Sequence, residues 1–251
     1  MIPKIIHCCW FGSKTFTEEV KSCMDTWSKF LPDFELKIWN EENTTNYHNT
    51  YFKQCIREKM YSFASDYIRL CVVRDYGGIY LDTDMHFIKP LPNSVLSDAF
   101  FAGYHDNEYI TIAVFGAIRN HPLIDNLIDK NYKNVFDFID PPVLPRVVTN
   151  SINDFLSNNP SSLNIYSTNT FYPVPFKNRF ESYEKYITEE TIAIHVWHYS
   201  WDSIYQTSTS EKIGKLVVSL FHGYSFQFVL SKLRKIARGY FSNKRRQLGF
   251  K

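Results

Sequence analysis

The sequence contains no apolar run long enough to form a membrane-spanning helix. About 18 consecutive apolar residues would be needed, and no such stretch occurs in the 251 residues. The apolar run at the start, residues 1–12, is too short for the hydrophobic region and cleavage site of a signal peptide. Internal repeats and low-complexity segments are also missing. We therefore expect a cytoplasmic protein without a spanning helix.

Paired cysteine spacing is absent as well. The five cysteines are Cys8, Cys9, Cys23, Cys55 and Cys71, an odd number with no CxxC motif. This pattern fits neither a zinc site nor a disulfide framework. Reduced thiols, as found in cytosolic proteins, fit it better.

Acidic residues are missing from one part of the chain. Residues 212–251 contain ten Lys and Arg and no Asp or Glu, which leaves 18 basic and 26 acidic groups, a balance of −8, in residues 1–211. We predict two parts, a catalytic domain at 1–211 and a basic C-terminal extension at 212–251.

The extension has the pattern of a basic amphipathic helix. Its apolar side chains recur at helical spacing with Lys and Arg between them: Leu230, Leu233, Ile236, Ala237 and Tyr240. Such a helix can lie on an anionic membrane surface, here the inner face of the membrane. Alternatively, it docks on the body of the protein and leaves its basic end solvated. Nucleic acid is not expected as a partner, because aromatic platforms at suitable spacing are missing.

The composition provides for a large core, with 44% hydrophobic and 17% aromatic residues. The chain begins with a strand at residues 2–10, a helix at 17–30 that Thr17 can cap, and a strand at 34–39. This βαβ start indicates an α/β fold with a parallel sheet. The remaining predicted elements are one or two helices at 51–76, strands at 79–81, 85–88, 99–102, 110–117 and 192–197, and helices at 121–132 and 143–157.

Two aspartates directly follow a short apolar strand. Ile79, Tyr80 and Leu81 run into Asp82-Thr83-Asp84, and strands of open α/β sheets direct such residues to the edge where ligands bind. Two carboxylates this close repel one another unless a cation lies beside them. Mg²⁺ or Mn²⁺ prefers oxygen ligands and shares its shell with substrate phosphates. We predict that Asp82 and Asp84 hold such a cation against a departing diphosphate; a solvated acidic turn is the alternative.

A second polar pair lies just upstream. Asp66 and Arg69 are three residues apart on the predicted helix, so they share one face. The helix leads through Gly77 and Gly78, a strong stop signal, into the Asp82 strand. The pair can hydrogen-bond sugar hydroxyls, and Arg69 can also face phosphate oxygens. An ordinary surface salt bridge is the alternative.

Aromatic and histidine side chains occur at the ends of the first and last predicted strands. The last strand carries His195, Trp197 and His198, and neutral imidazole is a good ligand for Mn²⁺-like metals. A core histidine among aromatic rings is the alternative. Trp10, which ends the first strand, can stack on a nucleobase or pack in the core.

Three segments together resemble glycosyltransferase family 32, a group of DXD-containing sugar transferases. They are SFASDYIRLCVVRDYGGIYLDTDM, IPKIIHCCWFG and AIHVWHYSW, and the resemblance covers about residues 1–205. It implies a GT-A fold, a mixed Rossmann-like sheet flanked by helices. It also implies retaining transfer of a hexose from a nucleotide-sugar with Mn²⁺ or Mg²⁺.

The resemblance also implies roles for individual residues. Trp10 corresponds to the aromatic that stacks on the base, and Asp82 to the carboxylate near the ribose and sugar. Further implied roles are a sugar-contacting pair at Asp66 and Arg69, a direct metal ligand at Asp84, a nucleotide contact at Asn43, and metal or diphosphate contacts at His195 and Trp197.

The sequence thus predicts a hexosyltransferase that uses a UDP-sugar rather than GDP-mannose. By family analogy the acceptor is a glycan or lipid-linked oligosaccharide, such as a capsular or other bacterial surface polysaccharide. Two alternatives remain open: a catalytically silent protein that binds nucleotide-sugars or glycans, and a metal-dependent nucleotide-sugar hydrolase.

Overall fold

The computed structural model describes residues 1–12, 15–134, 136–137, 141, 143–159, 163–197, 213–214, 216–218, 220 and 224–247, with side chains up to residue 238. The chain divides into two compact units. The first comprises residues 1–136 and 141–199, and the second comprises residues 137–140 and 200–251.

The first unit opens with the predicted βαβ arrangement. Strand β1 spans Ile5–Cys9, helix α1 spans Glu18–Phe30, and strand β2 spans Glu35–Trp39. β1 starts later than predicted, because Pro3 has no N–H to donate to a ladder. The Thr17 hydroxyl accepts a hydrogen bond from the Val20 amide at 3.4 Å, which confirms the predicted N-cap.

The helical stretch after β2 consists of two pieces. Helix α2 spans Thr50–Arg57 and helix α3 spans Tyr61–Tyr76. α3 ends at Gly77, whose φ of 66° is the left-handed conformation that favours glycine. The chain then turns directly into β3, Gly78–Leu81. A Cβ atom on Gly78 would lie 2.7 Å from the carbonyl oxygen of Ile5, so this close approach of β3 to β1 requires glycine.

The main sheet has six strands in the order β2-β1-β3-β6-β5-β7. β5 spans Phe100–Tyr104, β6 spans Ile110–Ala117 and β7 spans Asn164–Tyr166. The first three strands are parallel, as the βαβ start predicts, and β6 runs antiparallel to both β3 and β5. The short turn between β5 and β6 explains this, because so short a connection joins only antiparallel strands. The α/β class with a mixed sheet flanked by helices is confirmed.

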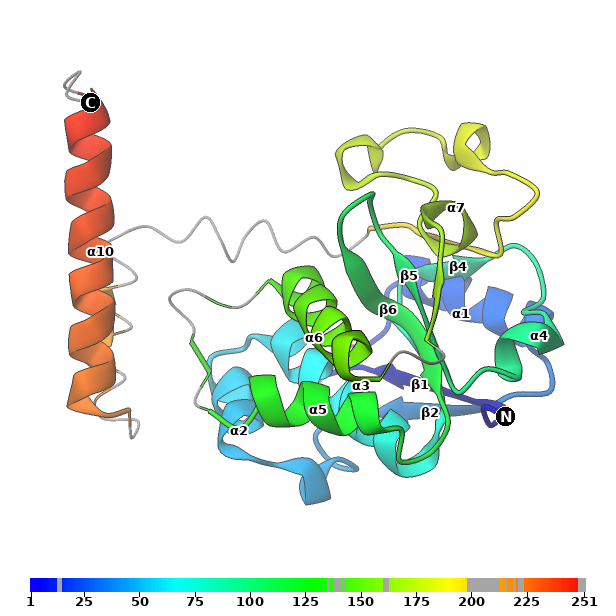
Figure 1. Ribbon diagram of the computed structural model, residues 1–251, viewed down its shortest axis with the longest axis horizontal. Coiled ribbons are helices and arrows are strands. Elements are labelled where there is room, and N and C mark those ends of the chain that lie inside the picture. Colours follow the sequence, from blue (N-terminus) through cyan, green and yellow to red (C-terminus); the bar gives the residue numbers. More distant parts are fainter. Residues whose placement is uncertain are drawn as a thin grey trace. The chain divides into compact units, whose positions relative to one another are not determined.

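Helices and a small second sheet cover the two faces of the main sheet (Figure 1). On one face, side chains from β1 and β3 such as Ile6 and Leu81 form a core with Trp27 of α1. On the other face α3 packs against β1 and β3, and α6 (Leu144–Asn158) packs against β6. The remaining described helical elements are α4 (Asn93–Leu96), α5 (Pro122–Asn131), α7 (Thr168–Phe171), and three 3₁₀ turns, η1 (Thr45–Tyr47), η2 (Phe176–Asn178) and η3 (Tyr183–Tyr186).

The last predicted strand lies outside the main sheet. β4 (Met85–Phe87) and β8 (Ala193–His195) form a separate two-stranded antiparallel ladder in which Met85 is opposite His195. β8 is shorter than the predicted 192–197. This pairing brings residue 195 beside the chain that leaves the Asp82–Asp84 turn.

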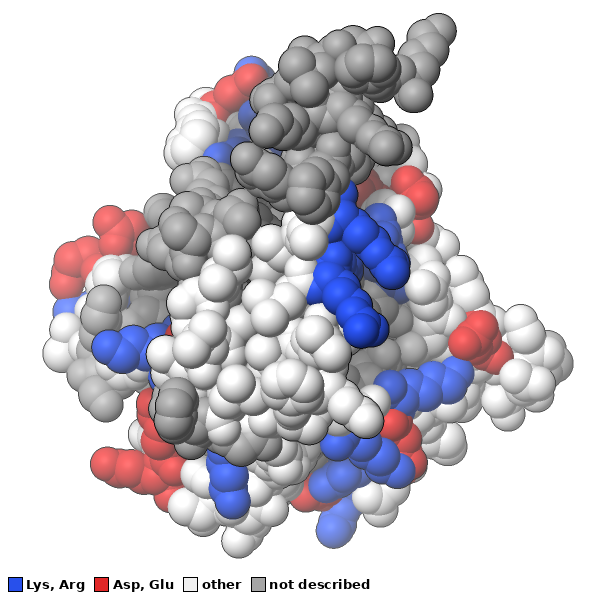
Figure 2. Space-filling model, turned by 90° about the vertical axis from the view of Figure 1, so that its left-hand side faces the viewer, with Lys and Arg blue, Asp and Glu red and all other residues white. Residues whose placement is uncertain are grey.

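The second unit contains helix α10, Phe226–Gln247. Of the predicted apolar positions, Leu230, Leu233 and Ile236 are half-buried, whereas Ala237 is exposed. The Tyr240 side chain and the predicted boundary at 211–212 lie outside the described residues. Arg234, Lys235 and Arg238 are exposed, and Figure 2 shows several Lys and Arg side chains grouped near the middle of the view. Within the described parts of the chain, no helix combines the length and apolarity needed to cross a bilayer.

All five cysteines are free and buried, which agrees with the predicted reduced thiols.

Candidate active site

The candidate site lies where the strand order of the sheet reverses. β2 and β3 flank β1 on opposite sides and all three run parallel, so their carboxyl ends share one edge. Ligands of open α/β sheets bind outside this edge at the point of reversal. The turn of Asp82 and Asp84 follows β3 there, and the Asp82 amide donates to the carbonyl of Ala113 at 2.7 Å.

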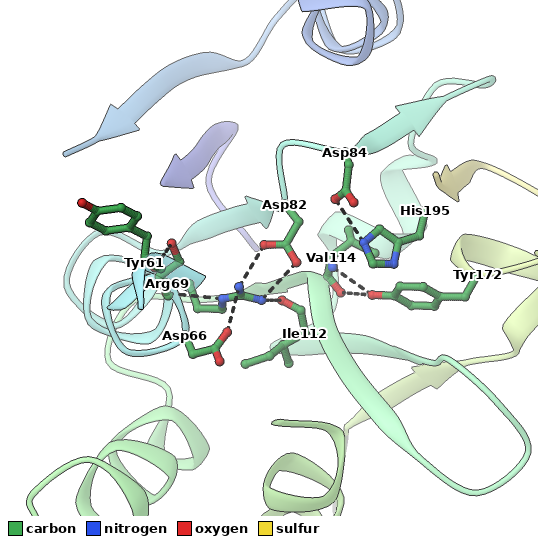
Figure 3. A network of polar contacts seen from close by, with 10 residues as sticks. Tyr61, Asp66, Arg69, Asp82, Asp84, Ile112, Val114, Tyr172 and His195 are labelled. Carbon is green, nitrogen blue, oxygen red and sulfur yellow. Dashed lines mark hydrogen bonds and ion pairs between the residues drawn. The ribbon is translucent and has the colours of Figure 1, made fainter. Parts of the chain in front are cut away.

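Arg69 is the centre of a buried ion-pair network (Figure 3). One terminal nitrogen lies 2.9 Å from Oδ1 of both Asp66 and Asp82. The other donates to the Ile112 carbonyl oxygen at 2.9 Å. The side chains of Asp66 and Arg69 are 2% and 3% exposed. This geometry excludes the ordinary surface salt bridge that the sequence left open.

Burial and like charges shift the pKa of the carboxyls in this network. Burial raises the pKa of Asp66 to about 7, although Arg69 opposes the shift. Burial also raises the pKa of Asp82; Arg69 again opposes this, and Asp84 adds to it. With all three carboxyls ionised and His195 neutral, three carboxylates face one guanidinium, an excess of negative charge that the raised pKa values of Asp66, Asp82 and His195 reflect. A divalent cation would cancel this excess, which agrees with the chemistry predicted for the turn.

Asp84 and His195 face each other across the β4–β8 ladder. Nε2 of His195 lies 3.0 Å from Oδ1 of Asp84, and both side chains are about 10% exposed. Burial alone would lower the pKa of His195, but the Asp84 carboxylate raises it above its ordinary value. Nδ1 of His195 is buried and has no hydrogen-bond partner among the described residues.

The residues present fit a divalent metal ion. Ligand atoms of Asp82, Asp84 and His195 all lie within 4.8 Å of one another. Two carboxylates and one imidazole form a donor set that suits Mn²⁺ and, through the oxygens, Mg²⁺. The structure therefore brings together the three predicted metal ligands, although residues 84 and 195 are far apart in the sequence.

Trp197 is held against this cluster in an unusual backbone conformation. Its φ of 57° lies in the left-handed region, which is rare for a bulky residue. Its ring lies 3.9 Å from that of His195, and its Nε1–H donates to the carbonyl of Val174 at 3.0 Å. His198 and Trp201, which the sequence placed beside it, lie outside the described residues.

The two residues predicted to contact the nucleotide, Trp10 and Asn43, follow strands β1 and β2. Trp10 is half-buried at the end of β1, with its ring 5.0 Å from that of Phe16. Asn43 stabilises a turn, because its side chain accepts from the Asn40 amide and donates to the Ile38 carbonyl, both at 2.8 Å. Their roles in nucleotide binding stay predictions.

Two tyrosines belong to the site without having been singled out from the sequence. The Arg69 guanidinium carbon lies 4.5 Å from the ring centroid of Tyr80. The Tyr172 hydroxyl accepts from the Val114 amide at 2.9 Å, and its ring packs edge-on against His195. The alternation of β3 could have indicated Tyr80, which lies two residues before Asp82. Nothing in the sequence around Tyr172 indicates its position.

Comparison with known proteins agrees with this geometry. Residues 17–102, which include Asp66, Arg69, Asp82 and Asp84, match the family described as the glycosyltransferase sugar-binding region containing DXD motif. Residues 17–102 therefore contain a DXD-type glycosyltransferase sugar-binding region. The match ends before β8, so it does not include His195 or Trp197.

Several curated glycosyltransferases are similar in sequence to this chain. An uncharacterized glycosyltransferase of Acanthamoeba polyphaga mimivirus is 27% identical over 177 residues, 64% of this chain and 69% of the relative. The human alpha-1,4-N-acetylglucosaminyltransferase is 28% identical over 149 residues, 54% of this chain and 42% of the relative. Toxin A of Clostridium novyi is 30% identical over 120 residues, 47% of this chain but 5% of the toxin. The chain thus spans less than half of the latter two proteins.

Among solved structures, PaToxG glycosyltransferase is 22% identical and covers 63% of this chain and 70% of its own, with a TM-score of 0.47. A likeness of this degree supports no further conclusion about the glycosyltransferase described here.

Proposed function

We propose that this glycosyltransferase transfers a hexose from a nucleotide-sugar, a UDP-sugar rather than GDP-mannose, to a glycan or lipid-linked oligosaccharide in a metal-dependent reaction. The observation that carries the proposal is the cluster of Asp82, Asp84 and His195 at the carboxyl edge of the sheet. The family match supports the transferase chemistry, and the charge of the cluster supports the metal.

In this proposal Asp84, Asp82 and His195 would hold Mn²⁺ or Mg²⁺, which would supply positive charge against the leaving diphosphate. Asp66 and Arg69 are so deeply buried that they act mainly through Asp82. Arg69 orients the Asp82 carboxylate, and its positive charge compensates one of the two carboxylates beside it. Such preorganised charges favour the oxocarbenium-like transition state without rearrangement during the reaction.

The nucleotide would lie along the β1 side of the site. Trp10 would stack on the base and Asn43 would contact the nucleotide, as the family resemblance implies. Trp197, fixed beside His195, would close the diphosphate site from the other side. Trp10→Ala should then weaken UDP binding roughly fivefold without changing Mn²⁺ binding, since an aromatic stack contributes about 1 kcal/mol.

We further propose that the configuration at the anomeric carbon is retained. The acceptor hydroxyl would attack from the face that the diphosphate leaves, and the leaving phosphate oxygen would accept the hydroxyl proton. Proton NMR of the first product formed distinguishes retention from inversion through the coupling constant of the anomeric proton. An inverted product would contradict this part of the proposal.

Replacement of Asp84 by Asn tests the metal role. Mn²⁺ together with a panel of UDP- and GDP-sugars should raise the thermal unfolding midpoint of the wild-type protein. Asp84→Asn should abolish that rise and reduce transfer at least about 100-fold, because a ligand charge is lost. Asp33→Asn is a matched control, since Asp33 is 76% exposed and pairs only loosely with Lys4.

The same assay separates transfer from its alternatives. Transfer requires an acceptor, whereas a hydrolase releases free sugar at full rate without one, and a silent binding protein shows the thermal shift without turnover. Full activity of Asp84→Asn in chelator would refute the metal role.

We also propose that α10 contacts an anionic membrane surface, where a lipid-linked acceptor would be found. The support is its exposed Arg234, Lys235 and Arg238 and the absence of acidic residues from 212–251. Each basic residue near such a surface contributes about 1 kcal/mol, so the double change Arg234→Gln and Arg238→Gln should weaken binding roughly thirtyfold.

Flotation with phosphatidylserine vesicles measures this loss of membrane binding. The matched Lys double variant keeps the charge and should float like wild type; equal flotation of the Gln variant would remove the membrane contact.

A further inference from the structure

The order of the strands leaves one side of the site for the acceptor. Trp10 follows β1, the DTD turn follows β3, and residues 105–109 connect β5 to β6. Because β6 is antiparallel to β3, this connection lies at the same edge of the sheet as the ends of β1 and β3. In the order β1-β3-β6-β5, Trp10 and the β5–β6 turn therefore flank Asp82 and Asp84 from opposite sides. A nucleotide on the Trp10 side leaves the β5–β6 side open to a second substrate.

Aromatic rings connect that open side to the metal ligands. The ring of Trp197 lies 3.9 Å from His195, whose Nε2 is 3.0 Å from Asp84. It also lies 6.3 Å from His105, in the β5–β6 turn, and 5.3 Å from Phe176, against which it packs edge-on. The Trp197 ring therefore lies against both Phe176 and His195, a metal ligand in the proposed function.

The aromatic rings farthest from His195 are exposed to solvent although they are apolar. Phe180 is 89% exposed and Phe176 is 38% exposed. The Arg179 guanidinium carbon lies 4.0 Å from the Phe176 ring centroid and 4.5 Å from that of Phe180. Arg179 also donates to the Phe176 carbonyl oxygen at 3.1 Å. The two rings are thus fixed by a shared cation, and Phe180 contributes almost nothing to the core.

We propose that Phe176, Arg179 and Phe180 form a subsite that binds a hexopyranose ring of the acceptor. A pyranose has one face of C–H groups, which packs against the face of an aromatic ring and removes apolar surface from water. The cation between the rings fixes the platform before the sugar arrives, so little side-chain freedom is lost on binding. This subsite rests on the proposed transferase function, because it assigns the second substrate of the same site.

Saturation-transfer NMR with three disaccharides tests the subsite. Lactose, N,N′-diacetylchitobiose and α-mannobiose are each mixed with the full-length protein, with and without UDP and Mn²⁺, and the protein's aromatic protons are irradiated. At least one disaccharide should receive saturation at its ring C–H protons. Phe180→Ala should reduce this signal roughly five- to tenfold, as expected when one ring face is lost from a contact. Phe180→Tyr retains the ring and should restore the signal.

Phe226→Ala is the matched control, because Phe226 is another exposed phenylalanine, at 68%, and lies in α10. Its signal should equal that of wild type. The proposal is overturned if no disaccharide receives saturation in the wild-type protein, or if Phe180→Ala gives the same signal as Phe226→Ala. Thermal shift with UDP and Mn²⁺ tests the proposed function separately. A signal that depends on Phe180 without any such shift would support the sugar subsite and refute the donor site.

Discussion

Asp82 and Asp84 are separated by a single residue, yet their surroundings differ. Asp82 faces Arg69 on what we term the closed side, comprising Asp66, Arg69 and Asp82. The side chains of Asp66 and Arg69 are 2% and 3% exposed, and that of Asp82 is 26% exposed. Asp84 faces His195 on the open side, where Nδ1 of His195 lacks a hydrogen-bond partner among the described residues. The comparison indicates that Asp66 and Arg69 fix the position of Asp82, whereas His195 beside Asp84 keeps one ring nitrogen without a partner among the described residues.

The largest effect on stability should come from removing the charge of Arg69, at the centre of the closed side. Arg69→Met leaves Asp66 and Asp82 without their shared cation in a buried position, which costs about 3–5 kcal/mol in the free energy of unfolding. Urea denaturation measures this loss. Arg74→Met is the matched control on the same helix, since Arg74 pairs with Asp75 but is 29% exposed, and it should cost at most about 1 kcal/mol. Equal losses for the two variants would mean that the closed side is an ordinary ion pair.

A substitution on the open side should reduce the affinity for a metal ion rather than the stability of the fold. His195→Phe keeps a ring between Trp197 and Tyr172 but removes the nitrogen ligand, so Mn²⁺ affinity should fall at least roughly tenfold. Electron paramagnetic resonance of free Mn²⁺ gives this affinity. His105→Phe alters another histidine against Trp197 and should bind Mn²⁺ normally. Unchanged affinity in His195→Phe would make His195 a core histidine.

A pH titration should reveal a buried neutral histidine in β1, His7. Nδ1 of His7 accepts a hydrogen bond from Trp39 at 3.1 Å, and Nε2–H donates to Gly77 at 2.8 Å. Trp39 can only donate, so His7 must be neutral, and burial lowers its pKa to about 4. As the pH falls below about 6.5, the unfolded chain binds a proton at this histidine while the folded protein does not. The free energy of unfolding therefore falls, by about 3 kcal/mol at pH 4 relative to neutral pH.

His7→Gln should remove this part of the pH dependence, because glutamine does not titrate. Denaturant midpoints of both proteins across this pH range give the difference. Parallel curves for the two would show that His7 is not the group that titrates.

The smallest effect concerns backbone strain outside the site. Lys59 joins α2 to α3 with a φ of 56°, so Lys59→Gly should stabilise the protein by about 0.5–1 kcal/mol. Asn120→Gly is the control and should change little, since asparagine tolerates its φ of 57°. Thermal unfolding measures both. At Trp197 the same substitution should destabilise instead, because the ring contacts with His195 and Phe176 are lost.

Each side could be predicted from the sequence only in part. Asp66 and Arg69 are three residues apart on one helix, so local spacing was enough to pair them, whereas the contact of Arg69 with Asp82 was seen only in the structure. The approach of His195 to Asp84 depends on the β4–β8 ladder, which local patterns do not encode; residue chemistry and the family resemblance indicated His195 as a ligand, but neither indicated the ladder. Tyr172 and the Phe176–Phe180 segment escaped prediction because their positions depend on long-range packing. The βαβ pattern likewise did not predict that β6 runs antiparallel to its neighbours.

The β4–β8 ladder also has a consequence for how the protein folds. It joins positions 85–87 to positions 193–195, so the chain between them must already be arranged before the imidazole reaches the aspartate. Closing so long a loop is entropically unfavourable until intervening strands have formed. Binding of Mn²⁺ at the proposed metal site should therefore be among the last events of refolding, and stopped-flow measurement of that binding would time the completion of the native topology.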